Sequence, residues 1–299
     1  GIGDDGRLVG AAIGAAATGA MIGREPPAGR FFVTADQVRG DEVMITGGDA
    51  RHILAVLRRR VGDRLLLIGP DGSEWLATIV ATTPEPLQVY ARIVERRRPQ
   101  REPLTRVTIA QALIKGDKFD WVVQKATELG AHAFLPFAAT RSVLRLAGQR
   151  ADKRLERWRR IAQAAAEQSG RLHVPEVGAV LTIDELTSRV RHHSQAAGAD
   201  SVVLAWEGER QRSLFELLRR RLGDPPPVAS SHHGPHPAEL MVVIGPEGGF
   251  ERDEVERLVA AGAVTVSLGP LIFRTETAGP AVLAMILYHS GDLGRLPRG

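Results

Sequence analysis

Two glycine–proline loops contain the residues of this sequence that are best placed for chemistry. Gly245–Gly249 (GPEGG) directly follows the apolar run Met241–Ile244, and Leu268–Glu276 (LGPLIFRTE) follows the run Val264–Ser267. Glycine at the end of a strand lets the backbone approach a ligand closely, and proline stiffens the loop around it. A helix that begins after Gly249 can also present free N–H groups to an anion. One such loop is an ordinary strand-to-helix turn, whereas two, each after a buried strand, favour a binding site.

The rest of the sequence narrows the kind of site that these loops can form. Neither loop matches GxGxxG or GxxxxGK[ST], so neither a dinucleotide site nor a P-loop is predicted there. The chain has no cysteine, which excludes disulfides, thiolate zinc sites and cysteine nucleophiles. His232, His233 and His236 lie in a Pro/Ser-rich stretch with only Glu239 nearby, which favours a solvated loop over a metal site. We therefore expect no metal, and a cytoplasmic protein.

Positive charge is concentrated in three segments. Residues 51–64, 92–106 and 141–171 contain 20 Lys and Arg against 6 Asp and Glu, whereas the rest of the chain contains 19 against 29. A basic surface on an otherwise acidic protein fits a polyanion, and nucleic acid is the leading candidate. Aromatic residues make up only 5%, which leaves few platforms for base stacking. The alternative is an Arg-rich surface that reflects genome composition.

Short apolar runs separated by turns predict a small β-domain over residues 30–98. The Asp71-Gly72 turn indicates a hairpin, and residues 49–60 are interpreted as one short helix. This number of short strands implies a small β-barrel, of a size that suits RNA docking. The expected strands are Phe31–Val33, Glu42–Ile45, Arg64–Ile68, Trp75–Val80 and Leu87–Val94.

Strands and helices alternate after a charged, proline-bracketed boundary at residues 96–103, and they define a second domain over 103–292. This alternation predicts a parallel sheet covered by helices on both faces. Ligands of such sheets bind beyond the carboxyl ends of the strands, where both loops lie. The expected strands are Val107–Ala110, His132–Phe137, Ser201–Trp206, Glu239–Ile244 and Val264–Leu268. The expected helices are Asp117–Leu129, Ala151–Ser169, Leu214–Arg221, Arg252–Ala261 and Thr277–Tyr288.

Residues 1–29 stand apart from both domains. They are rich in Gly and Ala, and Leu8–Ile22 has nearly the small-xxx-small spacing that packs membrane helices. This apolar run is only about 15 residues long, below the roughly 17 needed to span a bilayer. No basic region precedes it. We expect a poorly ordered extension.

Several motifs occur in the order of a known family. Ile244–Phe250 contains GPEGG, and Leu268–Ala278 contains LGP followed by RTETA. The chain resembles the 16S ribosomal RNA uracil-N3 methyltransferases, which belong to the SPOUT class, over about residues 31–290. His52–Asp63 is similar to the family's PUA-like barrel, and Lys115–Gly130 is similar to the start of its methyltransferase domain. Further matches are Trp158–Ile161, Glu167–Arg171 and Pro175-Glu176.

The resemblance implies a fold, a cofactor and partners. The fold is of the α/β class, a knotted SPOUT methyltransferase domain with a mostly parallel sheet, preceded by a small PUA-like β-barrel. The cofactor is S-adenosyl-L-methionine, used without metal, and the partners are 16S rRNA of the small ribosomal subunit and a second copy of the chain. Leu271 departs from the family, which commonly has a basic residue there. The implied cofactor residues are Leu204, Gly245, Glu247, Gly248, Leu268, Gly269, Ile272 and Arg274.

Methylation of uracil N3 requires that the nitrogen lose its proton. Each pKa unit above the ambient pH costs about 1.4 kcal/mol, so a base or an oxyanion stabiliser is valuable. We expect Glu276 to accept the proton and Arg274 to stabilise charge on a uracil oxygen. Three alternatives stay open: Glu276 caps the last helix, Glu247 is the base, or Arg274 binds a phosphate or the cofactor carboxylate.

RNA contacts are expected from the basic segments, and Gln168 belongs to a family motif. Two other functions stay open: a SPOUT methyltransferase acting on another RNA, such as tRNA, and a non-catalytic RNA-binding protein. The second would keep the barrel and the basic helix but lose the glycine–proline loops, which are intact here. The expected RNA-binding residues are Arg58, Arg59, Arg141, Arg159, Gln168 and Arg171.

Overall fold

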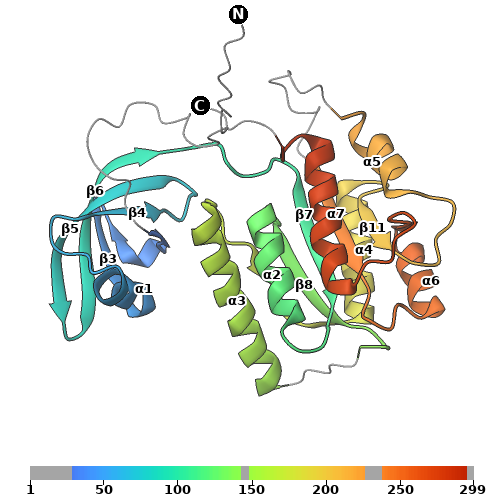
Figure 1. The fold of residues 1–299 in the computed structure, drawn as a ribbon, viewed down its shortest axis with the longest axis horizontal. Coiled ribbons are helices and arrows are strands. Elements are labelled where there is room, and N and C mark those ends of the chain that lie inside the picture. Colours follow the sequence, from blue (N-terminus) through green and yellow to red (C-terminus); the bar gives the residue numbers. More distant parts are fainter. Residues whose placement is uncertain (1–28, 143–147, 226–237, 295–299) are drawn as a thin grey trace, which may run out of the picture.

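The computed structural model describes residues 29–142, 148–225 and 238–294. These residues form two sheets, each with its own helices, arranged along the long axis of the molecule (Figure 1). The predictions for residues 1–28 and for His232, His233 and His236 lie outside the described residues. Within the described ranges, no helix combines the length and apolarity needed to cross a membrane.

The N-terminal sheet is a curled half-barrel of six strands in the order β1-β4-β5-β6-β3-β2. Its pairs are antiparallel except for β1 and β4. The predicted helix over 49–60 is instead α1 (Gly47–Arg51) followed by a π-helical turn (His52–Val56), in which Ile53 and Ala50 pack into the sheet core. The strands are β1 (Arg30–Phe32), β2 (Val38–Arg39), β3 (Glu42–Thr46), β4 (Arg64–Ile68), β5 (Glu74–Pro84) and β6 (Leu87–Arg97), with a 3-10 turn at Ala35–Gln37.

The C-terminal sheet is parallel at every pair of described strands, as the alternating pattern predicts. Its order is β10-β8-β7-β12-β11-β13, and β9 pairs with β8. All of these strands therefore end at the same edge of the sheet. They are β7 (Arg106–Ala112), β8 (Ala133–Ala138), β9 (Glu176–Val177), β10 (Leu181–Thr182), β11 (Val202–Ala205), β12 (Glu239–Ile244) and β13 (Ala263–Val266).

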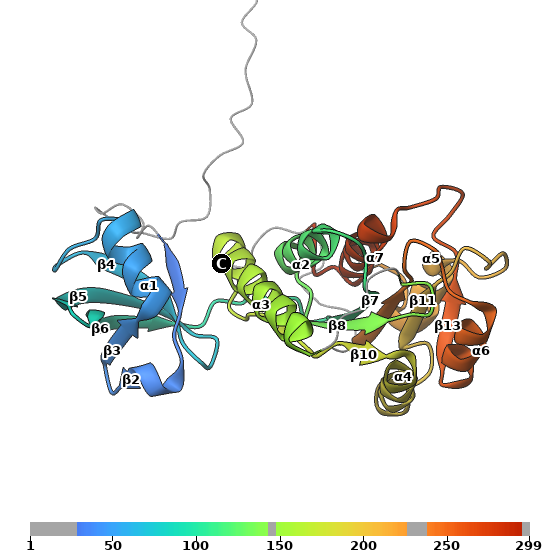
Figure 2. The same ribbon diagram turned by 90° about the horizontal axis from the view of Figure 1, so that it is seen from below.

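Helices cover both faces of this sheet (Figure 2). On one face lie α2 (Lys118–Leu129), α3 (Gln149–Ser169), α5 (Leu214–Leu222) and α7 (Thr275–Ser290), which share one apolar core. On the other face lie α4 (Ile183–Ala197) and α6 (Arg252–Ala260), which share a second core. The two cores explain why the central strands are apolar throughout rather than alternating.

Helix α4 was missed by the sequence reading, although its start carries a local signal. The Thr182 hydroxyl accepts the backbone N–H of Glu185, and the Glu185 carboxylate accepts that of Thr182. This reciprocal pair is a capping box, which the T-x-x-E spacing encodes. Leu186 and Val190 then pack against the sheet, where the long polar face of the helix had hidden their periodicity.

The chain doubles back at the end of the sheet. Beyond β13 it returns past β11 so that α7 packs against β12 and α2. On the way, the Ser267 N–H donates to the Arg212 carbonyl at 2.8 Å, and the Leu214 N–H donates to the Ser267 carbonyl at 3.1 Å. These bonds join the segment after β11 to the segment after β13.

Candidate active site

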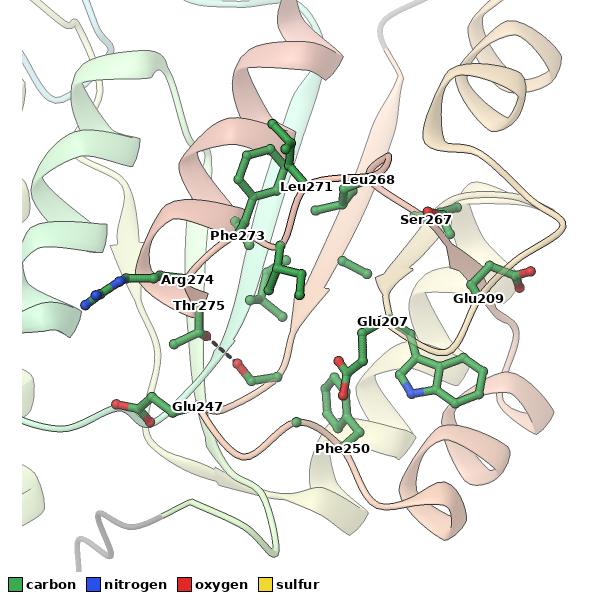
Figure 3. A pocket seen from close by; sticks show the side chains of 18 of the residues that line it. Glu207, Glu209, Glu247, Phe250, Ser267, Leu268, Leu271, Phe273, Arg274 and Thr275 are labelled. Carbon is green, nitrogen blue, oxygen red and sulfur yellow. Dashed lines mark hydrogen bonds between the residues drawn. The ribbon is translucent and has the colours of Figure 1, made fainter.

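A cavity of about 1130 Å³ opens where β11, β12 and β13 end (Figure 3). Its walls are the segments that follow these three strands, together with the first residues of α2 and α7. The sequence reading had placed a ligand site at this edge. The cofactor residues expected there that line the cavity are Gly245, Glu247, Gly248, Leu268, Gly269, Ile272 and Arg274.

Leu204 is the exception among the expected cofactor residues. Its side chain is fully buried in the core shared with α4 and α6, one residue before β11 ends. The cavity begins beyond the strand, where Ala205 and Trp206 form the wall. Ala205 and Trp206 therefore line the cavity where Leu204 was expected to.

Close packing explains the glycine at the start of the first loop. A Cβ on Gly245 would lie 2.9 Å from the ring of Phe250, too close for any side chain without movement of that ring. Phe250 is itself buried and stacks on Phe137, with ring centroids 6.1 Å apart. The loop backbone thus packs closely against the buried ring of Phe250, and this packing holds its peptide groups at defined positions beside the cavity.

A buried hydrogen-bond chain fixes the start of α7. The Thr275 hydroxyl donates to the Gly245 carbonyl, so it must accept its other bond, which the Gln111 amide donates at 3.1 Å. Gln111 lies on β7 and is fully buried. These two hydrogen bonds hold Thr275, and with it the flanking Arg274 and Glu276, against the loop after β12. The sequence reading missed Gln111, whose only signal is a polar residue within a buried apolar strand.

Glu276 has one carboxylate oxygen paired and one free. Its side chain is 16% exposed, and Oε1 lies 3.4 Å from the ammonium of Lys118. Oε2 is buried without a hydrogen-bond partner among the described residues. The N-cap of α7 is Arg274, whose carbonyl accepts the N–H groups of Thr277 and Ala278. Glu276 makes no described capping bond, so its free oxygen remains an acceptor within the cavity wall.

Glu247, the other possible base, is already engaged. Its Oε1 accepts the backbone N–H of Lys115 at 3.1 Å and lies 3.8 Å from the Lys118 ammonium. These contacts tie the loop after β12 to the segment that leads into α2. Glu247 is therefore better suited to holding the loop than to receiving a proton.

Arg274 is exposed, and its side chain makes no hydrogen bond or ion pair within the described ranges. Figure 3 shows its side chain pointing away from the middle of the cavity. A guanidinium without a partner can bind an anionic group, whether a phosphate, a carboxylate or a developing oxyanion.

The cavity suits a ligand with an apolar body and charged groups. Its apolar wall includes Ile244, Val266 and Leu268. Four carboxylates and three cations also line it: Glu207, Glu209, Glu247, Glu276, Lys118, Arg210 and Arg274. A sulfonium nucleoside such as S-adenosylmethionine has this character, so the residues present fit the expected cofactor. Leu271, at the usually basic position, is 73% exposed and adds no charge.

The structure separates the expected RNA-binding residues into different environments. Arg58, Arg159 and Gln168 are exposed, and Arg159 donates to the Val177 carbonyl at 3.3 Å. Arg59 is half-buried. Arg141 donates to the Gly248 carbonyl at 3.1 Å, so it braces the first glycine–proline loop.

Arg171 does not meet the expectation of an RNA contact. It is 7% exposed, and its guanidinium donates to Glu102 at 2.6 Å and to the carbonyls of Thr127 and Ala131. With these partners the side chain joins α3, the end of α2 and the linker between the two sheets. Arg171 is therefore a structural residue. The sequence shows only that it lies in a basic segment, because its acidic partner, Glu102, is distant in sequence.

The segment 92–106 is likewise less basic in space than in sequence. Each of its arginines lies within 4 Å of a carboxylate, and most of those carboxylates belong to other segments. Pairing cancels much of the local field, although exposed pairs of this kind add little to stability. The pairs are Arg92–Glu42, Arg96–Asp41, Arg97–Glu95, Arg98–Asp71, Arg101–Glu74 and Arg106–Glu239.

Comparison with known proteins identifies two family domains in the chain. Residues 45–89 match the RNA methyltransferase PUA domain family, and residues 100–287 match the RNA methyltransferase domain family. A crystal structure of ribosomal RNA small subunit methyltransferase E from Neisseria gonorrhoeae, bound to S-adenosyl methionine, superposes with a TM-score of 0.71. It is 29% identical, and the match covers 87% of this chain and 96% of that one.

Two relatives of the same name are more similar in sequence. Ribosomal RNA small subunit methyltransferase E from Bacillus subtilis is 36% identical over 264 residues, which is 87% of this chain and 96% of the relative. That from Mycobacterium tuberculosis is 37% identical over 258 residues, 86% of this chain and 90% of the relative. With the half-barrel, the parallel sheet typical of the SPOUT class and the cavity at its carboxyl edge, these matches show that the chain belongs to the ribosomal RNA small subunit methyltransferase E family.

Proposed function

We propose that this protein transfers the methyl group of S-adenosylmethionine to N3 of a uridine in 16S rRNA. The observation that carries the residue assignment is the buried, unpartnered Oε2 of Glu276 in the wall of the cavity. A buried carboxylate oxygen without a donor lacks a hydrogen bond that a substrate N–H can supply.

The residues act in two steps on the uracil ring. Glu276 Oε2 accepts the N3 proton, and the electron pair left on the ring spreads to the uracil oxygens, where Arg274 can turn to stabilise it. The cofactor supplies an electrophilic methyl group on sulfur, which needs no metal. N3 then forms the new N–C bond as the S–C bond breaks. The cofactor residues proposed here are those that line the cavity, with Ala205 and Trp206 in place of Leu204.

RNA is proposed to bind across both domains. Arg58 and Arg59 follow the π-helical turn of the N-terminal sheet, and Arg159 and Gln168 lie on α3, which contacts β1. Arg141 lies beside the cavity. Such contacts would hold phosphates and RNA shape, while the target base leaves its stack to reach the cavity.

A homodimer in the cytoplasm, where ribosomes are made, completes the proposal. Apolar side chains near the cavity and on α7 are exposed: Ile272 is 97% and Tyr288 is 68% exposed. Neighbouring exposed apolar residues, such as Leu271 and Ile272, are typical of association surfaces. Light scattering of the wild type and of Tyr288→Glu would test this, with loss of the dimer expected in the variant and a wild-type monomer contradicting it.

The main test combines site mapping with kinetics. Methylated 16S rRNA and tRNA from cells with and without the gene are mapped by mass, and the N3-methyluridine is expected in 16S rRNA only. In single-turnover assays, Glu276→Gln should slow methyl transfer by about 10²- to 10⁴-fold, the usual contribution of a general base. The defect should shrink as pH rises, because solvent then removes the proton.

Two matched measurements complete this test. The control is Glu128→Gln, which should keep the wild-type rate. Glu128 lies on α2, outside the cavity, where its carboxylate pairs with Lys125. S-adenosylmethionine and RNA affinities should be unchanged in Glu276→Gln. An unchanged rate in that variant would remove Glu276 from the mechanism, and methyluridine found only in tRNA would replace the substrate.

A further inference from the structure

Lys118 joins three elements at the mouth of the cavity; it lies in the family-like segment Lys115–Gly130, but the sequence assigned it no role. It is the first residue of α2, and its ammonium lies 3.4 Å from Glu276 Oε1 and 3.8 Å from Glu247 Oε1. These carboxylates belong to α7 and to the loop after β12. One ammonium therefore connects α2 to both segments that carry the glycine–proline motifs.

The position of Lys118 is unfavourable for its helix. The N-terminus of a helix carries a partial positive charge, so a lysine in the first turn is repelled by the macrodipole. Asp117 precedes Lys118, but its carboxylate faces Arg154 at 3.9 Å and Arg157 at 3.3 Å on α3. The charge at Lys118 is thus balanced by the two cavity carboxylates rather than by its own helix.

The two carboxylates differ in what else holds them. Glu247 Oε1 also accepts the Lys115 N–H, so it is anchored without the lysine. Glu276 has no other described partner: Oε1 meets only Lys118, and Oε2 is buried and free. Lys118 is therefore the contact that decides which oxygen of Glu276 is occupied and which is open to a substrate.

We infer that Lys118 is a positioning residue for the reaction: its ammonium, anchored by Glu247, holds Glu276 Oε1 and so turns Oε2 towards the uracil N3–H. This inference rests on the role proposed above for Glu276. Lys118 itself exchanges no proton; the N3 proton passes to Glu276 Oε2, and the ion pair at Oε1 weakens once that carboxyl is neutral. Arg274, the other cation beside the site, has no contact with Glu276 in the described structure and is left for the uracil oxygen.

The test compares K118M, K118R, E276Q and the double variant K118M/E276Q in single-turnover methylation across a pH series. K118M should be slower than wild type by about ten- to hundredfold, the range that coupling between contacting charged groups covers. K118R should recover most of the rate, and K118M/E276Q should be no slower than E276Q alone.

The matched control is K125M, two turns along the same helix, where the lysine pairs with Glu128 away from the cavity. It should keep the wild-type rate and pH profile. Thermal unfolding and S-adenosylmethionine affinity are measured for every variant, and both should match wild type for K118M, whose side chain is 38% exposed. Should K118M fold poorly, K118Q replaces it.

Failure of this inference and failure of the proposed base give different results. A slow E276Q with a wild-type K118M would overturn the role of Lys118 alone. Losses that multiply in the double variant would also overturn it, because Lys118 would then act independently of Glu276. A wild-type rate in E276Q would overturn the proposed base, and with it the route by which Lys118 acts.

Discussion

The cavity and the junction between the two sheets both contain buried charges, but they use them differently. At the junction, Arg171 and Glu102 satisfy each other with several hydrogen bonds, and Arg171 also binds two carbonyls. At the cavity, Glu276 keeps an oxygen without a partner, and the Arg274 guanidinium has no partner among the described residues. Satisfied charges hold a fold together, whereas an unsatisfied group retains the capacity to bind or react.

Breaking the junction should have the largest effect on stability. Arg171→Met removes the guanidinium that donates to Glu102 and to two buried carbonyls, and loss of one partner of a buried pair costs about 3–5 kcal/mol. Urea unfolding should show this loss, whereas Arg159→Met on the exposed side of α3 should change the free energy of unfolding by less than about 0.5 kcal/mol. Equal stability of the two variants would mean that Arg171 is not structural.

Disrupting the support of the cavity should have a smaller effect on stability. Thr275→Val keeps the shape of the side chain but removes the hydroxyl that donates to the Gly245 carbonyl and accepts from the Gln111 amide. We expect a loss of about 1–3 kcal/mol in unfolding free energy, and slower methyl transfer because Arg274 and Glu276 flank the site. Thr277→Val, at an exposed position two residues further along α7, is the control. A wild-type rate in Thr275→Val would show that the chain of bonds does not position the site.

RNA affinity should distinguish unpaired arginines from paired ones. Arg58→Ala removes an exposed cation with no described carboxylate partner, whereas Arg98→Ala removes one that already pairs with Asp71 at 2.8 Å. In filter binding at several salt concentrations, Arg58→Ala should weaken binding and lower the salt slope by about 0.7–0.9, the value for one phosphate contact. Arg98→Ala should change neither. The reverse pattern would place the RNA on the opposite set of arginines.

The smallest effect on stability is expected from Glu167, a partly buried carboxyl on α3. Burial raises the pKa of Glu167 to about 6, and Asp49 on α1 adds to the increase, although a hydrogen bond from Gln163 opposes it. The unfolded chain then ionises this carboxyl at lower pH than the folded protein does. Stability should therefore fall as pH rises from about 4.5 to 6.

Glu167→Gln removes this titration but keeps an acceptor for Gln163. At pH 7.5 the variant should be more stable than wild type by about 1 kcal/mol, allowing for the partial exposure of the side chain. At pH 4.5 the two proteins should unfold alike. A stability difference that does not change between these pH values would contradict the assignment.

Local signals predicted some elements well and others poorly. Helix α2 ends at the predicted Leu129, because Gly130, at φ +110°, ends it with a left-handed residue. Strand β12 also has the predicted bounds. Helix α4 was missed because its apolar face is narrow, and the segment after β3 adopts a π-helical turn that no spacing rule indicates.

The two-domain order, the parallel sheet and the loops that line the cavity could all be predicted from the sequence. Each of them follows from short-range patterns in buried strands and glycine turns. Which charged side chains lack an ion-pair partner could be seen only in the tertiary structure. Lys118 meets Glu276 across more than a hundred residues of chain, and Arg171 meets Glu102 across a domain boundary. Local composition registers a charge but not its partner, because the attraction between charges depends on their distance in space.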